Sequence, residues 1–247
     1  MRELSLFSGA GGGLLGTKLL GWKHCGYVEY NDYCQRVIAK RIKDGILDEA
    51  PIFGDIRTFL SEGYAGAYQG MVDVVTSGFP CQPFSVAGKG LGEDDPRNMW
   101  PQTIGVIRQV RPRFALLENV PGLLAHPYFG TILGDLAETG FHVKWTVLGC
   151  GALGGVTKRE RLWLVGGCDF IDVERFNLHT RSSLEKYFRR TEPQGDIPYV
   201  ETSWIMANGY GSRTHDEVAE ILEPLKAIGN GQVPAVVKAV WRLMGPQ

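Results

Sequence analysis

The sequence around one cysteine favours a reactive role for its thiol over a structural one. Cys81 lies in residues 78–85, which read GFPCQPFS, and two prolines with two aromatic side chains suit neither a helix nor a central strand. We therefore predict a loop that presents a thiol, which is a candidate nucleophile if a neighbour lowers its pKa or supplies a base. A cysteine taken at random is more often a buried structural residue, so the interpretation depends on what accompanies it.

A carboxylic acid supplies the second element of this chemistry. Glu118 ends the apolar run 114–117, which places it at a strand end, where an acid can equally be a simple cap. A thiolate together with an acid that protonates a ring nitrogen is what nucleophilic activation of a pyrimidine needs. Addition of the thiolate to cytosine C6 with protonation of N3 creates an enamine, whose C5 can then attack an electrophilic methyl group. Cys81 and Glu118 would have to meet at one ring.

Predicted strands, helices and turns elsewhere in the chain must position Cys81 and Glu118. Residues 4–7 form a short apolar strand pattern that ends at the glycine turn 9–13, and residues 14–20 have helical spacing. Turns of this kind serve NAD, FAD and S-adenosylmethionine alike, and the spacing departs from a dinucleotide fingerprint. Glu29, at the end of the next predicted strand (24–29), is well placed for ribose hydroxyls.

The alternation of strands and helices through residue 167 predicts an α/β fold with a doubly wound, mostly parallel Rossmann-like sheet. We expect further strands at 71–76, 114–117, 141–148 and 161–165, and helices at 32–43 and 233–243. Because ligands bind outside the carboxyl ends of such strands, one rim should carry Gly9–Gly13, Glu29, Asp55, Cys81 and Glu118.

Composition narrows the class of protein. The 247 residues are 44% hydrophobic, enough for one main domain with a smaller appendage, and the formal net charge of -1 requires any nucleic-acid surface to be a local patch. The five cysteines include no C-x-x-C pair, so neither a disulfide framework nor a metal site is indicated. We see no signal peptide and no long apolar span, and expect a soluble protein of a reducing compartment.

The motifs together resemble those of C5-cytosine-specific DNA methyltransferases, in the family's order and over nearly the whole chain. The matching segments are 6–12 (LFSGAGG), 29–30 (EY), 54–56 (GDI), 79–82 (FPCQ), 118–120 (ENV), 159–161 (RER) and 229–234 (GNGQVP). The resemblance implies a DNA (cytosine-5-)-methyltransferase that works through a covalent bond between Cys81 and C6 of a flipped cytosine. It makes Glu118 the N3 proton donor, Arg161 the holder of the cytosine O2 or a flanking phosphate, and Arg159 a support for the nucleophile loop.

The resemblance also implies a cofactor and a partner. S-adenosylmethionine would be bound by Phe7, Ser8, Gly9, Gly11, Gly12, Glu29, Tyr30, Asp55, Ile56, Pro80, Asn230 and Val233. Double-stranded DNA would meet Ser85, Arg97, Asn119, Arg189, Arg190 and Arg213, with residues 86–98 closing over it as a lid. We expect a monomer in the cytoplasm of a bacterium or a phage-infected cell, with a restriction endonuclease as a partner that acts independently and with no membrane contact.

The chain is expected to divide into two parts. Residues 1–168 plus 227–247 would form the catalytic domain, and residues 169–226 a small subdomain that recognises the target. That subdomain carries 7 Lys+Arg against 11 Asp+Glu, and its basic residues concentrate in 175–190. Three alternatives stay open: a tRNA cytosine-5 methyltransferase of the same fold, a non-catalytic DNA-binding relative, and a nicotinamide-dependent oxidoreductase, which would leave the cysteine motif unexplained.

Overall fold

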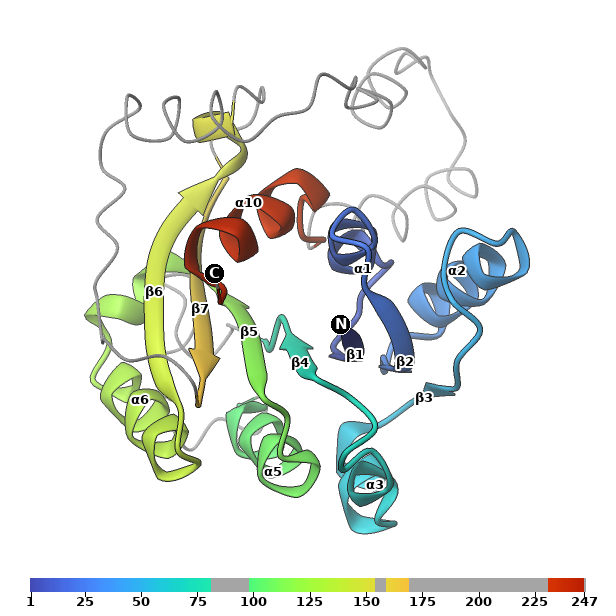
Figure 1. Cartoon of the computed structure of the whole chain (residues 1–247), viewed down its shortest axis with the longest axis horizontal. Helices are drawn as coiled ribbons and strands as arrows, with labels where there is room; N and C mark the ends of the chain where they lie inside the picture. The colour runs from blue at the N-terminus through green and yellow to red at the C-terminus, as the bar shows by residue number, and fades with distance from the viewer. Residues whose placement is uncertain (81–97, 154–158, 169–230, 247) are drawn as a thin grey trace, which may run out of the picture.

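A single mixed sheet organises the molecule (Figure 1). The computed structural model describes residues 1–80, 98–153, 159–168 and 231–246. Seven strands lie in the order β3-β2-β1-β4-β5-β7-β6. They are β1 (Arg2–Leu6), β2 (Lys23–Val28), β3 (Ile52–Phe53), β4 (Val74–Ser77), β5 (Phe114–Asn119), β6 (His142–Gly149) and β7 (Glu160–Gly167). The first five are parallel and β7 runs antiparallel to both β5 and β6, so the predicted mostly parallel sheet is confirmed.

Helices cover both faces of the sheet, as Figure 1 shows. On one face lie α1 (Gly12–Lys18), α2 (Asp32–Lys43) and α10 (Pro234–Met244), and on the other α3 (Ile56–Ser61), α4 (Tyr64–Ala67), α5 (Trp100–Val110) and α6 (Tyr128–Glu138). Two short 3-10 turns, η2 (Pro121–Ala125) and η3 (Cys150–Leu153), follow β5 and β6. Within the described residues, none of these helices is long and apolar enough to cross a membrane.

Strand β5 shows how the sequence builds a sheet that helices cover on both faces. All six of its residues are buried. Phe114 and Leu116 belong to the apolar cluster beneath α10, whereas Ala115 and Leu117 belong to the cluster beneath α5 and α6. Successive strand residues point to opposite faces, so a continuous apolar run is what a strand covered on both sides requires. Glu118 is the first polar residue of the run and follows Leu116 on the α10 face.

The last described helix returns to the beginning of the chain. Helix α10 packs against α1, and Trp241 makes an edge-to-face contact with Trp22 at 4.7 Å between ring centroids. The crossing is close because Gly16 lacks a side chain: a Cβ there would lie 2.6 Å from Val237 Cβ. This packing brings Gly231 and Gln232, just before α10, beside the glycine turn after β1.

Candidate active site

The turn after β1 is held in a conformation that few side chains accept. Phe7, Gly9 and Gly11 have φ values of 51°, 55° and 86°. Left-handed backbone is ordinary for glycine but costs a residue such as Phe7 on the order of 1 kcal/mol, and such strain concentrates at ligand sites. The turn exposes backbone at the start of α1, which begins at Gly12 without a side-chain cap.

Glu29 fastens this turn to the end of β2. Its Oε2 accepts a 2.6 Å hydrogen bond from the Gly9 amide and its Oε1 accepts one of 2.8 Å from the Asn31 amide. The side chain of Gln35 donates to the Glu29 carbonyl at 2.6 Å. Each carboxylate oxygen has further acceptor capacity. The carboxylate can therefore organise the turn and still accept a hydroxyl of a bound ribose.

Tyr30 and Asp55 line one open hollow of about 590 Å³ at the same edge. Tyr30 is 72% exposed, so its ring is available for stacking. Asp55 caps α3 by accepting from the Arg57 amide at 2.9 Å, and the Arg57 guanidinium keeps the pKa of that carboxyl below its usual value. The side chain of Ile56 is 4% exposed and packs in the core.

Glu118 and Arg161 form an ion pair at the carboxyl end of β5. Arg161 Nε lies 2.8 Å from Glu118 Oε1, and the glutamate is 9% exposed. Burial raises the pKa of Glu118 to about 7, an effect that the charges of Arg161 and Arg159 and a hydrogen bond from the Gln232 side chain partly oppose. The acid is therefore partly protonated near neutral pH, as a proton donor should be.

The antiparallel direction of β7 explains how the pair forms. Glu118 lies opposite Trp163 and Asn119 opposite Leu162, so the beginning of β7 adjoins the end of β5. Arg161 lies two residues before Trp163 and on the same face of the sheet. An arginine at the start of one strand thus reaches a glutamate near the end of another, and Arg159 lies just beyond it.

Gln232 is a site residue that the sequence analysis did not single out. Its backbone oxygen would lie 2.3 Å from a Cβ at Gly12, and its Oε1 would lie 2.3 Å from a Cβ at Gly13. Its Nε2 would lie 3.0 Å from a Cβ at Gly78. A Cβ at Gly78 would also lie 3.2 Å from Glu118 Oε2. Three glycines therefore make room for Gln232 between the turn and the acid. The sequence feature that could have identified it is its place in the family motif GNGQVP, from which only Asn230 and Val233 were predicted to bind the cofactor.

A hollow of about 50 Å³ joins these parts. The turn side is lined by Phe7, Ser8, Gly9 and Gly13, the catalytic side by Ser77, Gly78, Glu118, Gly231 and Gln232, and the floor by Glu3, Ser5, Leu6, Thr17, Thr76, Leu116 and Val237. Ser8 is nearly buried, and its hydroxyl donates to Ser5. Val233 precedes α10 and packs against the apolar cluster beneath that helix.

Asn119, expected at the nucleic acid, makes its hydrogen bonds inside the protein. It is 2% exposed, and a contact with nucleic acid stays a prediction. Its Nδ2 donates to the Phe79 carbonyl at 3.2 Å and its Oδ1 accepts from the Val120 amide at 2.8 Å. Because Phe79 leads through Pro80 into the predicted nucleophile loop, Asn119 holds the base of that loop.

Several predicted residues lie outside the described part of the chain. Among the catalytic and cofactor residues these are Cys81 and Asn230, and among the nucleic-acid residues Ser85, Arg97, Arg189, Arg190 and Arg213. Almost all of the expected lid and the whole of residues 169–226 lie outside it as well. The described rim brings together Gly9, Glu29, Glu118 and Arg161, with Tyr30 and Asp55 in the neighbouring hollow.

Solved structures share this architecture. A DNMT2 mutant from Spodoptera frugiperda superposes with a TM-score of 0.55 at 24% identity, covering 72% of this chain and 50% of its own. A putative DNA modification methyltransferase encoded within a prophage of E. coli gives a TM-score of 0.53 at 23% identity, covering 68% and 46%. At these identities the likeness shows the fold.

Sequence comparison identifies the family. Type II methyltransferase M.NgoMIV of Neisseria gonorrhoeae is 30% identical over 200 residues, covering 79% of this chain and 57% of its own length. Type II methyltransferase M.NaeI of Lentzea aerocolonigenes is 27% identical over 258 residues, covering 99% and 58%. The chain thus spans about half the length of the curated relatives it matches. The model of the C-5 cytosine-specific DNA methylases matches residues 1–239, and the chain belongs to that family.

Proposed function

We propose that this protein is a DNA (cytosine-5-)-methyltransferase that methylates C5 of a cytosine flipped out of a specific short duplex sequence. The observation that carries the proposal is the Glu118–Arg161 pair. A buried carboxyl whose pKa is raised to about 7 can protonate N3 of cytosine at neutral pH, which an exposed glutamate cannot do efficiently. Family membership supports the same reaction.

The residues around the glycine turn fit S-adenosylmethionine as the cofactor. Gly9 and Gly11 let backbone approach a ligand, Glu29 can accept a ribose hydroxyl, and Tyr30 with Asp55 offers a ring face and an acceptor for adenine. When bound, S-adenosylmethionine supplies an electrophilic methyl group. The glycine turn and Glu118 line the same hollow, which supports methyl transfer beside the acid.

The bond changes and proton transfers of the proposed reaction centre on the cytosine ring. The Cys81 thiolate forms a bond to C6 while Glu118 gives its proton to N3, so the ring becomes a neutral enamine. C5 would then take the methyl group as the methyl–sulfur bond of the bound cofactor breaks and S-adenosylhomocysteine is left, and a base would remove the C5 proton. The C5–C6 double bond returns as the thiolate leaves, and N3 gives its proton back to Glu118. Arg161 holds the carboxyl in place and stabilises its ionised form between these two transfers.

The remaining assignments are proposals of the same kind. Residues 1–168 with 227–247 would carry out catalysis, and residues 169–226 would read the DNA, with Arg189, Arg190 and Arg213 at the duplex. The names of the relatives support a role in a restriction–modification system. We propose a monomer whose endonuclease acts separately on the same sequence.

Methyl transfer to different nucleic acids tests the proposal. Wild type, Cys81→Ser and the control Cys168→Ser, which changes an exposed cysteine at the end of β7, are incubated with tritiated S-adenosylmethionine and duplex DNA or tRNA. We expect label in DNA for wild type and the control, and none for Cys81→Ser. Label in tRNA alone would establish a tRNA methyltransferase instead. Label in neither nucleic acid would refute the proposal that the protein is a methyltransferase.

A covalent trap tests the nucleophile separately. With S-adenosylmethionine present, a 5-fluorocytosine in duplex DNA has no C5 proton to lose after methyl transfer, so the thiol adduct should persist through denaturing electrophoresis. Wild type and Cys168→Ser should give a shifted band, whereas Cys81→Ser should give none. A shifted band with Cys81→Ser would show that another residue attacks C6.

A further inference from the structure

A second buried acid lies in the floor of the same hollow. Glu3, on β1, is 1% exposed, and its pKa is raised to about 7 by burial. Thr76 Oγ1 donates to its Oε1 at 2.6 Å. Within the described part of the chain, Oε2 has no hydrogen-bond partner, and the same is true of Ser77 Oγ, which lines the same hollow. Two such buried oxygens around one space indicate that a donor belongs there.

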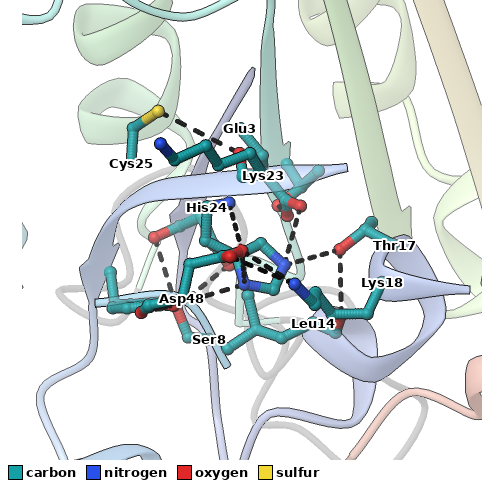
Figure 2. A network of polar contacts seen from close by, with 12 residues as sticks. Glu3, Ser8, Leu14, Thr17, Lys18, Lys23, His24, Cys25 and Asp48 are labelled. Atoms are coloured by element: carbon teal, nitrogen blue, oxygen red, sulfur yellow. Dashed lines mark hydrogen bonds and ion pairs between the residues drawn. The ribbon is translucent and has the colours of Figure 1, made fainter. Parts of the chain in front are cut away.

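The polar groups near Glu3 include the imidazole of His24, the ammonium of Lys18 and the hydroxyl of Thr17 (Figure 2). His24 Nε2 lies 3.4 Å from Oε2, and burial lowers the pKa of that imidazole to about 4, so it is neutral near pH 7. The Lys18 ammonium is bonded to Asp48. The Thr17 hydroxyl, close enough to lower the pKa of Glu3, donates to the Leu14 carbonyl at 3.0 Å. Among the described residues, an ionised Glu3 therefore has a hydrogen bond from Thr76 but no cation in contact with it.

The carboxyl of Glu3 extends toward the rim of the sheet. Thr76, its hydrogen-bond partner, lies opposite Ser5 in the register of β1 and β4, two residues nearer the glycine turn than Glu3. The space of about 50 Å³ above it admits a small group such as an ammonium or a water, and no aromatic ring. Glu118 lines the same hollow on its catalytic side.

We propose that Glu3 is a cofactor-positioning residue, the counter-charge for the ammonium of the cofactor's amino-acid end. This inference rests on the proposed function, because it takes S-adenosylmethionine as the ligand. The ammonium brings three donors and a positive charge, which is what an unpaired buried carboxylate needs. Once bound, it favours the ionised form of Glu3, so binding should release a proton near neutral pH.

Calorimetry with two ligands separates this role from a structural one. S-adenosylhomocysteine carries the ammonium, whereas 5′-methylthioadenosine lacks the whole amino-acid end. Glu3→Gln preserves shape and the bond from Thr76, so it should weaken S-adenosylhomocysteine about 10-fold or more and leave 5′-methylthioadenosine unchanged. Restoring a carboxylate at the level of Thr76 with E3Q/S5D should recover part of the loss.

The pH dependence provides a second readout. Wild-type affinity for S-adenosylhomocysteine should rise between pH 6 and 8 with proton release, and Glu3→Gln should flatten that rise. The groups that also act on Glu3 are Thr17, Thr76, Asp48 and the N-terminal amine, with His24 beside it and Glu118 across the hollow. Glu62→Gln, which changes an exposed glutamate at the end of α3, is the control and should retain the rise.

Two outcomes would overturn the inference in different ways. Equal weakening of both ligands by Glu3→Gln, or no weakening of either, would assign Glu3 to the fold alone and leave the methyltransferase proposal intact. Failure of wild type to bind S-adenosylhomocysteine at all would overturn the cofactor assignment and the inference together.

Discussion

Arg161 Nε lies 2.8 Å from Glu118 Oε1 across the antiparallel pair of β5 and β7. The contact joins two elements that the chain makes far apart and places a permanent positive charge against a buried acid. Burial raises the pKa of this carboxyl to about 7 and the Arg161 charge opposes part of that rise, so proton donation and recovery are both feasible near neutral pH.

Loss of the guanidinium should impair catalysis more than folding. Arg161→Ala removes the charge that opposes the raised pKa of Glu118, so that pKa should rise further and the basic limb of the rate profile should move to higher pH. We expect kcat/KM to fall roughly 100- to 1000-fold, measured by methyl transfer between pH 6 and 9. Arg108→Ala breaks a surface cluster with Asp135 and Glu138 and should stay within about twofold of wild type. A wild-type profile for Arg161→Ala would contradict the proposed pairing.

Gly78→Ala should displace the acid without unfolding the protein. The added Cβ would lie 3.2 Å from Glu118 Oε2 and 3.0 Å from Gln232 Nε2, so both side chains must shift. We expect kcat to fall about 10- to 100-fold, since small misplacements of catalytic groups have large effects. Gly130→Ala in α6, where the Cβ meets open space, is the matched control and should keep full activity. Equal activities of the two variants would refute this reading of Gly78.

Replacing the Glu29 carboxylate by an amide should weaken binding of the cofactor. Both of its oxygens accept backbone N–H bonds, from Gly9 and from Asn31. Glu29→Gln has one acceptor oxygen, so its NH₂ would face a donor and the glycine turn would loosen. We expect affinity for S-adenosylhomocysteine to fall about 10-fold by calorimetry, with Glu62→Gln on an exposed helix end unchanged. Unaltered binding by Glu29→Gln would show that the turn holds its shape without this carboxylate.

The crossing of α1 and α10 should be sensitive to a single methyl group. In Gly16→Ala the Cβ would lie 2.6 Å from Val237 Cβ and 2.8 Å from the Pro234 carbonyl oxygen, so the two helices must separate. We expect a loss of about 1–3 kcal/mol in the free energy of unfolding, seen as a lower Tm in thermal melts. Gly134→Ala, in open space on α6, should hold or raise the Tm because alanine favours helix.

Stability should fall as the pH rises toward and through 7. Glu3 and Glu118 have pKa values raised to about 7, so the folded state retains protons that the unfolded state loses above about 4.5. The pKa of His24 is lowered to about 4, so its effect has the opposite sign, and the stability it contributes is lost as the pH falls from about 6.5 through 4. Of these three groups, only the two carboxyls contribute to the change between pH 6.5 and 8.

Urea unfolding at pH 6.5 and pH 8 measures that effect. Wild type should be less stable at pH 8, and the variant that combines Glu3→Gln with Glu118→Gln should lose much less over the same interval. An equal loss in both proteins would mean that these two acids do not govern the dependence.

Local patterns predicted the elements well where one physical signal dominated. Helix α2 has the predicted residues 32–43, because Asn31 caps it by accepting from the Cys34 amide. Strand β4 was predicted to begin at residue 71 but begins at Val74. The apolar pattern could not show that Asp73 turns aside to bond Arg2, or that Met71 is half exposed. The parallel order of the first five strands followed from alternation with helices, whereas the antiparallel β7 was not predicted.

The parts of the site that escaped prediction depend on contacts between distant segments. Gln232 carries no chemical signature of its own and matters only because α10 packs against α1. Glu3 has the sequence context of an ordinary strand residue, and only its burial in the fold leaves its Oε2 without a hydrogen-bond partner among the described residues. Asn119 was selected from its motif alone, and its place at the end of β5 adds a hydrogen bond from its amide to the Phe79 carbonyl that no local pattern could show.

By itself, the sequence determined the chemistry that is possible here and the local scaffold that presents it. A cysteine between prolines, an acid after a buried strand, a glycine turn and an ordered set of family motifs are short-range patterns, and residue type and spacing are enough to define them. Only the tertiary structure decided which groups meet and in what protonation state. The antiparallel β7 brings Arg161 to Glu118, and α10 brings Gln232 between the turn and the acid. Burial then raises the pKa of Glu118, because desolvation depends on everything packed around a group and not on its neighbours in the chain.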